Sequence, residues 1–137
     1  MVRHALTLPG LTVMALVPNR RGAEAALAAG VHKLSIPVST SAAHSLANVR
    51  KTRDEMVAEV RHIVALRHER APQVQIEVGV STAFGCTLPG AVPEDEVIAL
   101  AEQLVAAGVD ECGLSDTTGM ANHAQAAGQR RGFLCPV

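Results

Sequence analysis

Strand-like runs alternate with helical runs along this chain, and this alternation restricts the fold more than any other feature. The strand-like runs are "TVMALV" (12–17), "HKLSIPV" (32–38), "VQIEVGV" (74–80) and "VDECGL" (109–114). Helical patterns lie between them, at 21–30, 49–68 and 93–107. A strand–helix order repeated in this way is typical of right-handed βαβ crossovers and a parallel sheet.

Spacing and end signals support each helical segment. Met56, Val60 and Ile63 fall on one face at helical spacing. Pro93 is followed by three acidic residues, which suits a helix start, because proline fits the first turn and carboxylates face the positive end of the helix dipole. Gly30 follows the first segment as a natural C-terminal stop. These signals predict three helices between the strands.

Two residues within the strand-like runs carry specific expectations. Pro37 argues against an interior strand position, because proline donates no hydrogen bond to a neighbouring strand. In the third run, Ile76 and Val78 alternate with Glu77. If the apolar pair faces the helices, Glu77 points into a barrel interior. An acid there needs a partner, which the sequence does not identify.

Two architectures use this order of elements: the doubly wound open sheet and the (β/α)8 barrel. No GxGxxG or GxxxxGK[ST] motif follows a strand, so a nucleotide site at a first turn lacks support. Polar residues follow every predicted strand: Asn19, Ser39 and Thr40, Ser81 and Thr82, and Ser115 and Asp116. Turn formation or helix capping explains each of them singly. Their occurrence at all strand ends favours a barrel, in which these ends share one face.

Composition argues against several classes of function. The 137 residues carry a net charge of -1, which gives no reason to expect a nucleic-acid partner. With two Phe and no Tyr or Trp, the chain lacks base-stacking platforms. Cys86, Cys112 and Cys135 show no CxxC spacing, so we expect reduced thiols in a cytoplasmic protein. No apolar run reaches the length of a membrane span, and we expect no membrane partner.

Three segments resemble hydroxymethylglutaryl-CoA lyases. They are "VPNRRGAEAALAAGV" (17–31), "VSTAFGCTLPGAVPEDEV" (80–97) and "AAGVDECGLSDTTGMAN" (106–122), in the family's order and at its spacing. That family belongs to a metal-dependent (β/α)8 superfamily of lyases and condensing enzymes. The resemblance implies an α/β fold: a partial (β/α)8 TIM barrel with about four parallel strands alternating with helices. These would be strands three to six of the eight.

The resemblance also divides the chain into two regions. Residues 1–122 are expected to form a partial TIM-barrel lyase domain. The segment 123–137 loses all periodicity, and His123 stands where the family usually has a proline. We expect 123–137 to be a divergent C-terminal tail, and the chain to be a truncated or frame-disrupted copy.

The resemblance implies a retro-Claisen cleavage of 3-hydroxy-3-methylglutaryl-CoA to acetyl-CoA and acetoacetate, a reaction of leucine degradation. In the family a divalent cation, Mg²⁺ or Mn²⁺, holds substrate oxygens and spreads the developing charge. The family's metal ligands lie in an Arg-Asp-Gly segment and a His-x-His pair, and neither motif has a match in this chain. We therefore assign no metal ligand here and expect that this chain does not bind the cation alone.

Five residues are candidates for the site that the resemblance implies. Asp116 matches a catalytic acid of the family, with helix capping as the alternative. Asn48 and Asn19 match asparagines at the barrel mouth and are predicted to bind substrate, with turn formation as the alternative for Asn19. Ser39 and Ser81 are further substrate-binding candidates because they lie at strand ends.

Two functions fit these observations. The first is a hydroxymethylglutaryl-CoA lyase-like protein with an acyl-CoA substrate; activity of the chain alone is doubtful because the metal ligands lie on strands that it lacks. The alternative is a catalytically inactive half-barrel that dimerises or pairs with another chain, since four strands cannot close a barrel of eight. Open sheet edges lead us to expect a homo-oligomer.

Overall fold

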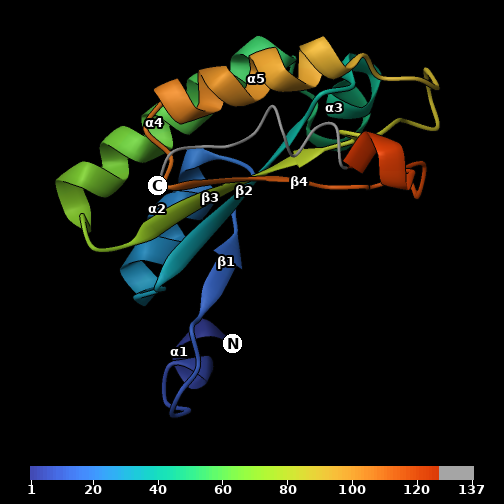
Figure 1. The fold of residues 1–137 in the computed structure, drawn as a ribbon. Helices are drawn as coiled ribbons and strands as arrows, with labels where there is room; N and C mark the ends of the chain where they lie inside the picture. Colours follow the sequence, from blue (N-terminus) through green and yellow to red (C-terminus); the bar gives the residue numbers. More distant parts are fainter. Residues whose placement is uncertain (127–137) are drawn as a thin grey trace.

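Four parallel strands alternate with helices in the computed structural model, which describes residues 1–126 (Figure 1). The strands are β1 (Met14–Leu16), β2 (Lys33–Ser39), β3 (Gln75–Ser81) and β4 (Glu111–Leu114). The helices are α1 (Val2–Ala5), α2 (Arg20–Ala29), α3 (Ala42–Val49), α4 (Arg53–Arg70) and α5 (Glu94–Ala106). The sheet order is β1-β2-β3-β4, without the reversal that a doubly wound sheet shows. This confirms the predicted α/β fold of four parallel strands.

One face of the sheet forms the apolar core with the helices. Leu34 is in register with Ile76, and Ile36 is in register with Val78. These four side chains are fully buried, together with Val38 and Val80 on the same face. In Figure 1, α4 and α5 lie along this side of the strands. The alternation seen in the sequence is therefore the alternation between a helix-covered face and the opposite face.

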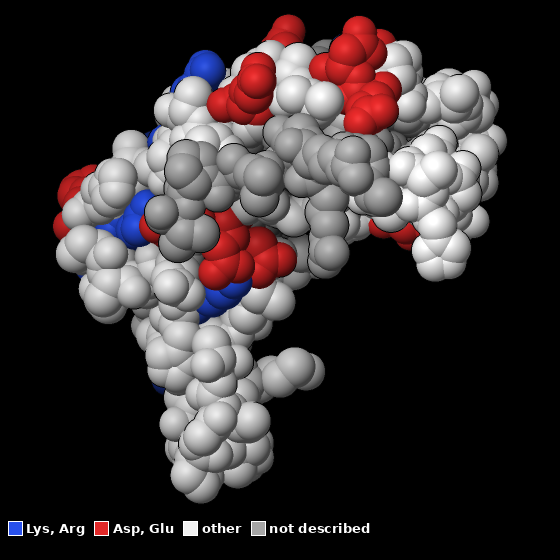
Figure 2. Space-filling view, in the orientation of Figure 1, with Lys and Arg blue, Asp and Glu red and all other residues white. Residues whose placement is uncertain are grey.

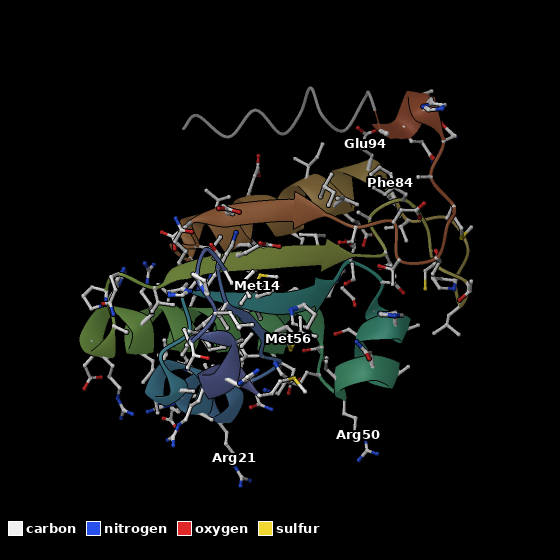
Figure 3. All side chains as sticks on the ribbon, turned by 90° about the horizontal axis from the view of Figure 1, so that it is seen from below. Met14, Arg21, Arg50, Met56, Phe84 and Glu94 are labelled. Atoms are coloured by element: carbon white, nitrogen blue, oxygen red, sulfur yellow. The ribbon has the colours of Figure 1, made fainter. Side chains whose placement is uncertain are left out.

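The opposite face, which we call the inner face, carries mostly polar or exposed residues. Its residues, taken from the strand register, are Met14, Leu16, Lys33, Ser35, Pro37, Ser39, Gln75, Glu77, Gly79, Ser81, Glu111 and Gly113. Leu16 is 71% exposed and Met14 is 52% exposed. Seen from below, the strands lie in front of α5 (Figure 3). Parallel sheets are normally covered on both faces, so this arrangement is one half of a layered structure.

Pro37 lies in an interior strand, so the argument against that position was wrong. β2 is placed between β1 and β3. The carbonyl of Ser35 accepts a hydrogen bond from the N–H of Val17 at 2.9 Å, so the odd-numbered peptide groups of β2 face β1. Because β1 ends at Leu16, the N–H that Pro37 lacks would point past the end of that strand.

The helix predicted at 49–68 begins later in the structure, as α4 at Arg53, and continues to Arg70. The short helix α3, which the sequence pattern did not predict, ends at Val49, and Arg50 follows in the left-handed region with φ of 56°. The next helix, α4, begins at Arg53 with a capping box: the Thr52 hydroxyl accepts from the N–H of Glu55, and the Glu55 carboxylate accepts from the N–H of Thr52. The hydrogen bond that the Thr52 N–H donates to the Glu55 carboxylate is the largest cause that lowers the pKa of Glu55.

Replacing Thr52 by alanine removes the acceptor for the N–H of Glu55. We expect the free energy of unfolding to fall by about 1 kcal/mol, the usual effect of losing an N-cap. Urea unfolding followed by circular dichroism measures the change. Thr87→Ala is the matched control, because Thr87 is exposed in the loop between β3 and α5. Equal destabilisation by both variants would contradict the capping role.

Candidate functional site

The carboxyl ends of the four strands lie at the same end of the sheet, which we call the rim. It comprises residues 18–19, 39–41, 81–82 and 115–118. All four strands are parallel, so the chain leaves each of them at this end of the sheet. Four of the residues predicted from sequence lie here: Asn19, Ser39, Ser81 and Asp116. The fifth, Asn48, lies near the end of α3.

Thr82 links three of the strand ends. Its hydroxyl accepts a hydrogen bond from the N–H of Ser41 at 3.1 Å and donates one to the carbonyl of Ser81 at 2.6 Å. Its own N–H donates to the hydroxyl of Thr117 at 2.9 Å. Thr82 is fully buried, and its φ of 57° is rare for a β-branched residue. This strained residue fixes the segments that follow β2, β3 and β4 relative to one another.

Ser39 and Ser81 are register partners at the last position of β2 and β3. The Ser39 hydroxyl lies 2.7 Å from Nδ1 of His44, in the first turn of α3, and Ser39 is only 5% exposed. Ser81 is half-buried, and its carbonyl accepts the N–H of Thr40 at 3.0 Å. The structure therefore brings the two predicted serines together on the inner face.

Asn19 and Asn48 line one cleft of about 390 Å³. The other lining residues are Leu16, Pro18, Pro37, Val49 and Lys51. Oδ1 of Asn19 accepts the N–H of Gly22 at 2.9 Å and so caps α2, which is the turn-forming role named as its alternative. Asn48 is exposed. The two predicted asparagines, 29 positions apart in the printed sequence, thus border the same opening.

Lys51, which also lines this cleft, forms an ion pair with Glu59 of α4. Glu59 accepts a further hydrogen bond from the N–H of Arg20 at 2.5 Å, which ties α2 to α4 beneath the cleft. Burial raises the pKa of Glu59, but the hydrogen bonds from Lys51 and Arg20 lower it by more, so the pKa lies below its ordinary value of 4.5. The carboxylate therefore stays ionised at neutral pH.

Asp116 is exposed at the rim, where its carboxylate stabilises a turn. One oxygen accepts the N–H of Met120 at 2.9 Å, and the other accepts the N–H of Ala121 at 3.2 Å. The following helical turn is capped by Asn122, whose Oδ1 accepts from the N–H of Gln125 at 2.9 Å. The helix-capping alternative is therefore not what these hydrogen bonds show for Asp116. Its catalytic role stays a prediction, as do the substrate-binding roles of the other four residues.

The divalent cation that the resemblance implies finds no ligand set here. Within residues 1–126, no group of three or more His, Cys, Asp or Glu side chains is placed to hold a metal ion. Asp116 is the one acid in the rim segments. A Mg²⁺ or Mn²⁺ site needs several oxygen ligands, so these residues do not fit it.

Sequence reasoning missed the cation that pairs with Glu77. The ammonium of Lys33 lies 2.8 Å from the Glu77 carboxylate and 2.5 Å from that of Glu111. We call these three residues the inner-face ion cluster. Their side chains are 14%, 30% and 53% exposed, in the order Lys33, Glu77, Glu111. Lys33 had a detectable signal, because it alternates with Leu34 and therefore shares the face of Glu77.

The two carboxylates raise the pKa of Lys33 above its ordinary value of 10.5. Hydrogen bonds with Glu111 and then Glu77 favour the charged ammonium and outweigh the opposing effect of burial. Lys33 therefore stays protonated at neutral pH and acts as a counter-ion.

The HMGL-like family model matches residues 2–134. The chain belongs to the HMGL-like family. Hydroxymethylglutaryl-CoA lyase YngG of Bacillus subtilis is 37% identical to it over 118 residues, which are 85% of this chain and 38% of that protein. The (R)-citramalyl-CoA lyase of Chloroflexus aurantiacus is 37% identical over 120 residues, covering 88% of this chain and 37% of the relative.

A solved structure also matches most of this HMGL-like chain, while the match covers less than half of the solved chain. The HMG-CoA lyase of Acinetobacter baumannii, in complex with coenzyme A and 3-methylmalate, matches with a TM-score of 0.82 and 34% identity. The match covers 89% of this chain and 39% of that one. The predicted resemblance and the partial-barrel fold are therefore confirmed, and the chain spans well under half the length of these relatives.

The structure bears only in part on two expectations from sequence, those on a membrane span and on the C-terminal tail. No helix within residues 1–126 is long and apolar enough to cross a membrane. The predicted tail at 123–137 lies, from residue 127 onward, outside the described residues.

Replacing Lys33 by methionine leaves Glu77 and Glu111 without their shared cation. We expect the free energy of unfolding to fall by about 1 kcal/mol near neutral pH, a modest value because solvent screens the half-exposed Glu111. Because the pKa of Lys33 is higher in the folded than in the unfolded state, its ion pairs stabilise the fold below about pH 10.5. That contribution is lost as the pH rises through the folded pKa.

The difference in free energy of unfolding between the unaltered chain and Lys33→Met should therefore become smaller at strongly alkaline pH. Urea unfolding at neutral and alkaline pH measures it. Arg21→Met is the control, because Arg21 points away from the sheet in Figure 3. A difference that persists unchanged at high pH would show that the ammonium charge is not the cause.

Proposed function

We propose that this chain forms one sector of a lyase barrel that cleaves an acyl-CoA of the hydroxymethylglutaryl-CoA type by a retro-Claisen reaction. The family match over residues 2–134 carries the proposal. The polar rim supports it, because barrel enzymes bind substrate at the carboxyl ends of their strands. The acyl-CoA class is supported by the coenzyme A complex of the A. baumannii lyase.

Asn48, Asn19, Ser39 and Ser81 are the proposed substrate-binding residues. An acyl-CoA of this type carries thioester and carboxylate oxygens that need hydrogen-bond donors. Amide NH2 groups and hydroxyls provide such donors. The shared cleft of Asn19 and Asn48, and the register pairing of Ser39 with Ser81, support their action on one ligand.

Asp116 is the proposed catalytic residue. Retro-Claisen cleavage requires that a proton leave the tertiary hydroxyl and that the resulting thioester enolate be protonated. A carboxylate has about four lone-pair sites, so Asp116 can accept a substrate hydroxyl while it holds its two backbone N–H groups. The turn would then keep the carboxylate in position.

Cleavage on this account needs strands beyond the four described. Four strands with two edges do not enclose a barrel interior, and the curated relatives are much longer than the matched region. We propose that the metal dependence of the reaction resides on those further strands. We also propose a cytoplasmic protein of leucine degradation, as the resemblance and the reduced cysteines predicted from sequence suggest.

A second candidate function is a catalytically inactive half-barrel that associates with itself or with another chain. The exposed Leu16 and Met14, on the edge strand β1, favour it. The expected homo-oligomer belongs to this candidate and stays a prediction that sizing chromatography tests. Lyase activity of a completed barrel and association of the open sheet are compatible properties.

Replacing Asn48 by alanine should weaken binding of coenzyme A thioesters. Loss of one hydrogen bond of about 0.5–1.5 kcal/mol corresponds to roughly a twofold to twelvefold rise in Kd. Isothermal titration calorimetry with hydroxymethylglutaryl-CoA measures it. The matched control is Asn122→Ala, whose position lies beyond the rim segments. Equal affinity of the chain and of Asn48→Ala would remove Asn48 from the site.

The purified chain should show no turnover of hydroxymethylglutaryl-CoA in the presence of Mg²⁺. The reason is that the described residues hold no ligand set for the cation. Release of acetoacetate, followed against the B. subtilis enzyme as a positive control, measures the activity. Turnover by the chain alone would overturn the view that cleavage needs further strands.

A further inference from the structure

The inner face carries a charge imbalance that the proposed chemistry does not use. One ammonium, that of Lys33, is shared by the carboxylates of Glu77 and Glu111. The other inner-face residues of the four strands are uncharged: Met14, Leu16, Ser35, Pro37, Ser39, Gln75, Gly79, Ser81 and Gly113. The face therefore has one surplus negative charge. Figure 2 shows acidic and basic atoms gathered side by side near the middle of the molecule.

The surplus charge lies toward β4, the last strand of the sheet within residues 1–126. Glu111 belongs to β4, the last strand in the sheet order, and its side chain is the most exposed of the cluster, at 53%. A cleft of about 420 Å³ runs along this edge. It is lined by Glu77, Val105, Val109, Asp110, Glu111, Cys112 and Gly113. An added strand would lie here, because an edge strand presents backbone groups that pair with a neighbouring strand.

Closing the inner face would remove this cluster from water. An unbalanced charge is far more costly in a low-dielectric interior than at a surface, whereas a paired one is tolerated. Lys33 already makes contacts with both acids, so it cannot balance them alone. The element that covers the face must therefore bring a positive charge of its own.

We propose that the inner face and the β4 edge of the described sheet dock a partner sheet that places a Lys or Arg side chain against Glu111. The proposal rests on the proposed function only in that the open sheet is one part of a barrel. A guanidinium or ammonium in that position would pair with Glu111 and leave Lys33 to Glu77. The partner is thus selected by charge as well as by strand geometry.

A second copy of this chain lacks that property. It would present the same cluster, so two copies closed on each other would enclose two surplus negative charges. Like charges across an interface disfavour the wrong partner. Self-association of the chain, where it occurs, should therefore leave the ion cluster in water, as a contact through the exposed Met14 and Leu16 of β1 would.

A charge-altered copy of the chain provides a partner sheet of known structure. In Glu111→Lys the cluster holds two cations and one carboxylate, so its surplus is positive. Sedimentation velocity at low salt compares three samples: the chain, the variant and an equal mixture. We expect the mixture to form a heterodimer with a Kd at least about tenfold below that of either homodimer.

Glu111→Gln and Glu102→Lys serve as companion variants. Glu111→Gln makes the cluster neutral and should tighten self-association relative to the unaltered chain. Glu102→Lys changes the net charge equally but lies exposed on α5, and mixing it with the chain should give no heterodimer. Urea unfolding checks that each variant is folded.

Three results would overturn the proposal: an unaltered chain that dimerises as tightly as the mixture, equal enhancement by Glu102→Lys, or no association in any sample of folded protein. The readout requires no acyl-CoA. A failure of docking is therefore distinguishable from a failure of the proposed lyase function, which the thioester titration tests separately.

Discussion

Within residues 1–126, the parallel sheet has helices on one face only, and the rest of the structure depends on this constraint. The helix-facing side of β2 and β3 is fully buried, while Leu16 on the other side is 71% exposed. Such sheets normally have both faces covered. The inner face instead carries polar rim residues and an ion cluster of Lys33, Glu77 and Glu111. Both features suit the wall of a barrel better than the surface of an independent domain.

The two ends of the sheet have different roles. At the rim, Thr82 in a strained conformation holds three chain segments together around exposed polar groups. At the opposite end, buried Arg67 forms an ion pair with Asp110 at 3.3 Å, and Asp110 accepts the N–H of Ile76 at 2.7 Å. The Arg67 guanidinium also donates to the carbonyl of Gly108 at 3.3 Å. This end stabilises the fold. In barrel enzymes generally, ligands bind at the other end, which corresponds to the rim.

Periodicity was sufficient to predict the strands and the buried face, because alternation is a local property of the chain. It failed where the outcome depends on a neighbour. Pro37 is tolerated because β1 ends early. The partner of Glu77 depends on the pairing of β2 with β3, which places Lys33 diagonally across from Glu77, two residues from its register partner Ser35. Helix α3 ends before Arg50, which has a left-handed backbone conformation, and the sequence has neither glycine nor proline there to predict this end. For Asp116, the sequence named a catalytic and a helix-capping role, whereas the geometry shows a carboxylate that closes a turn.

The central claim is that this polypeptide is a sector of a lyase barrel, and a chimera tests it most directly. The segment of the B. subtilis lyase YngG that aligns with this chain would be replaced by this chain's residues. The account predicts a folded chimera that releases acetoacetate from hydroxymethylglutaryl-CoA, with the metal ligands contributed by the remainder of the host enzyme. A folded chimera that binds the thioester but does not cleave it, beside an active parent enzyme, would contradict the account.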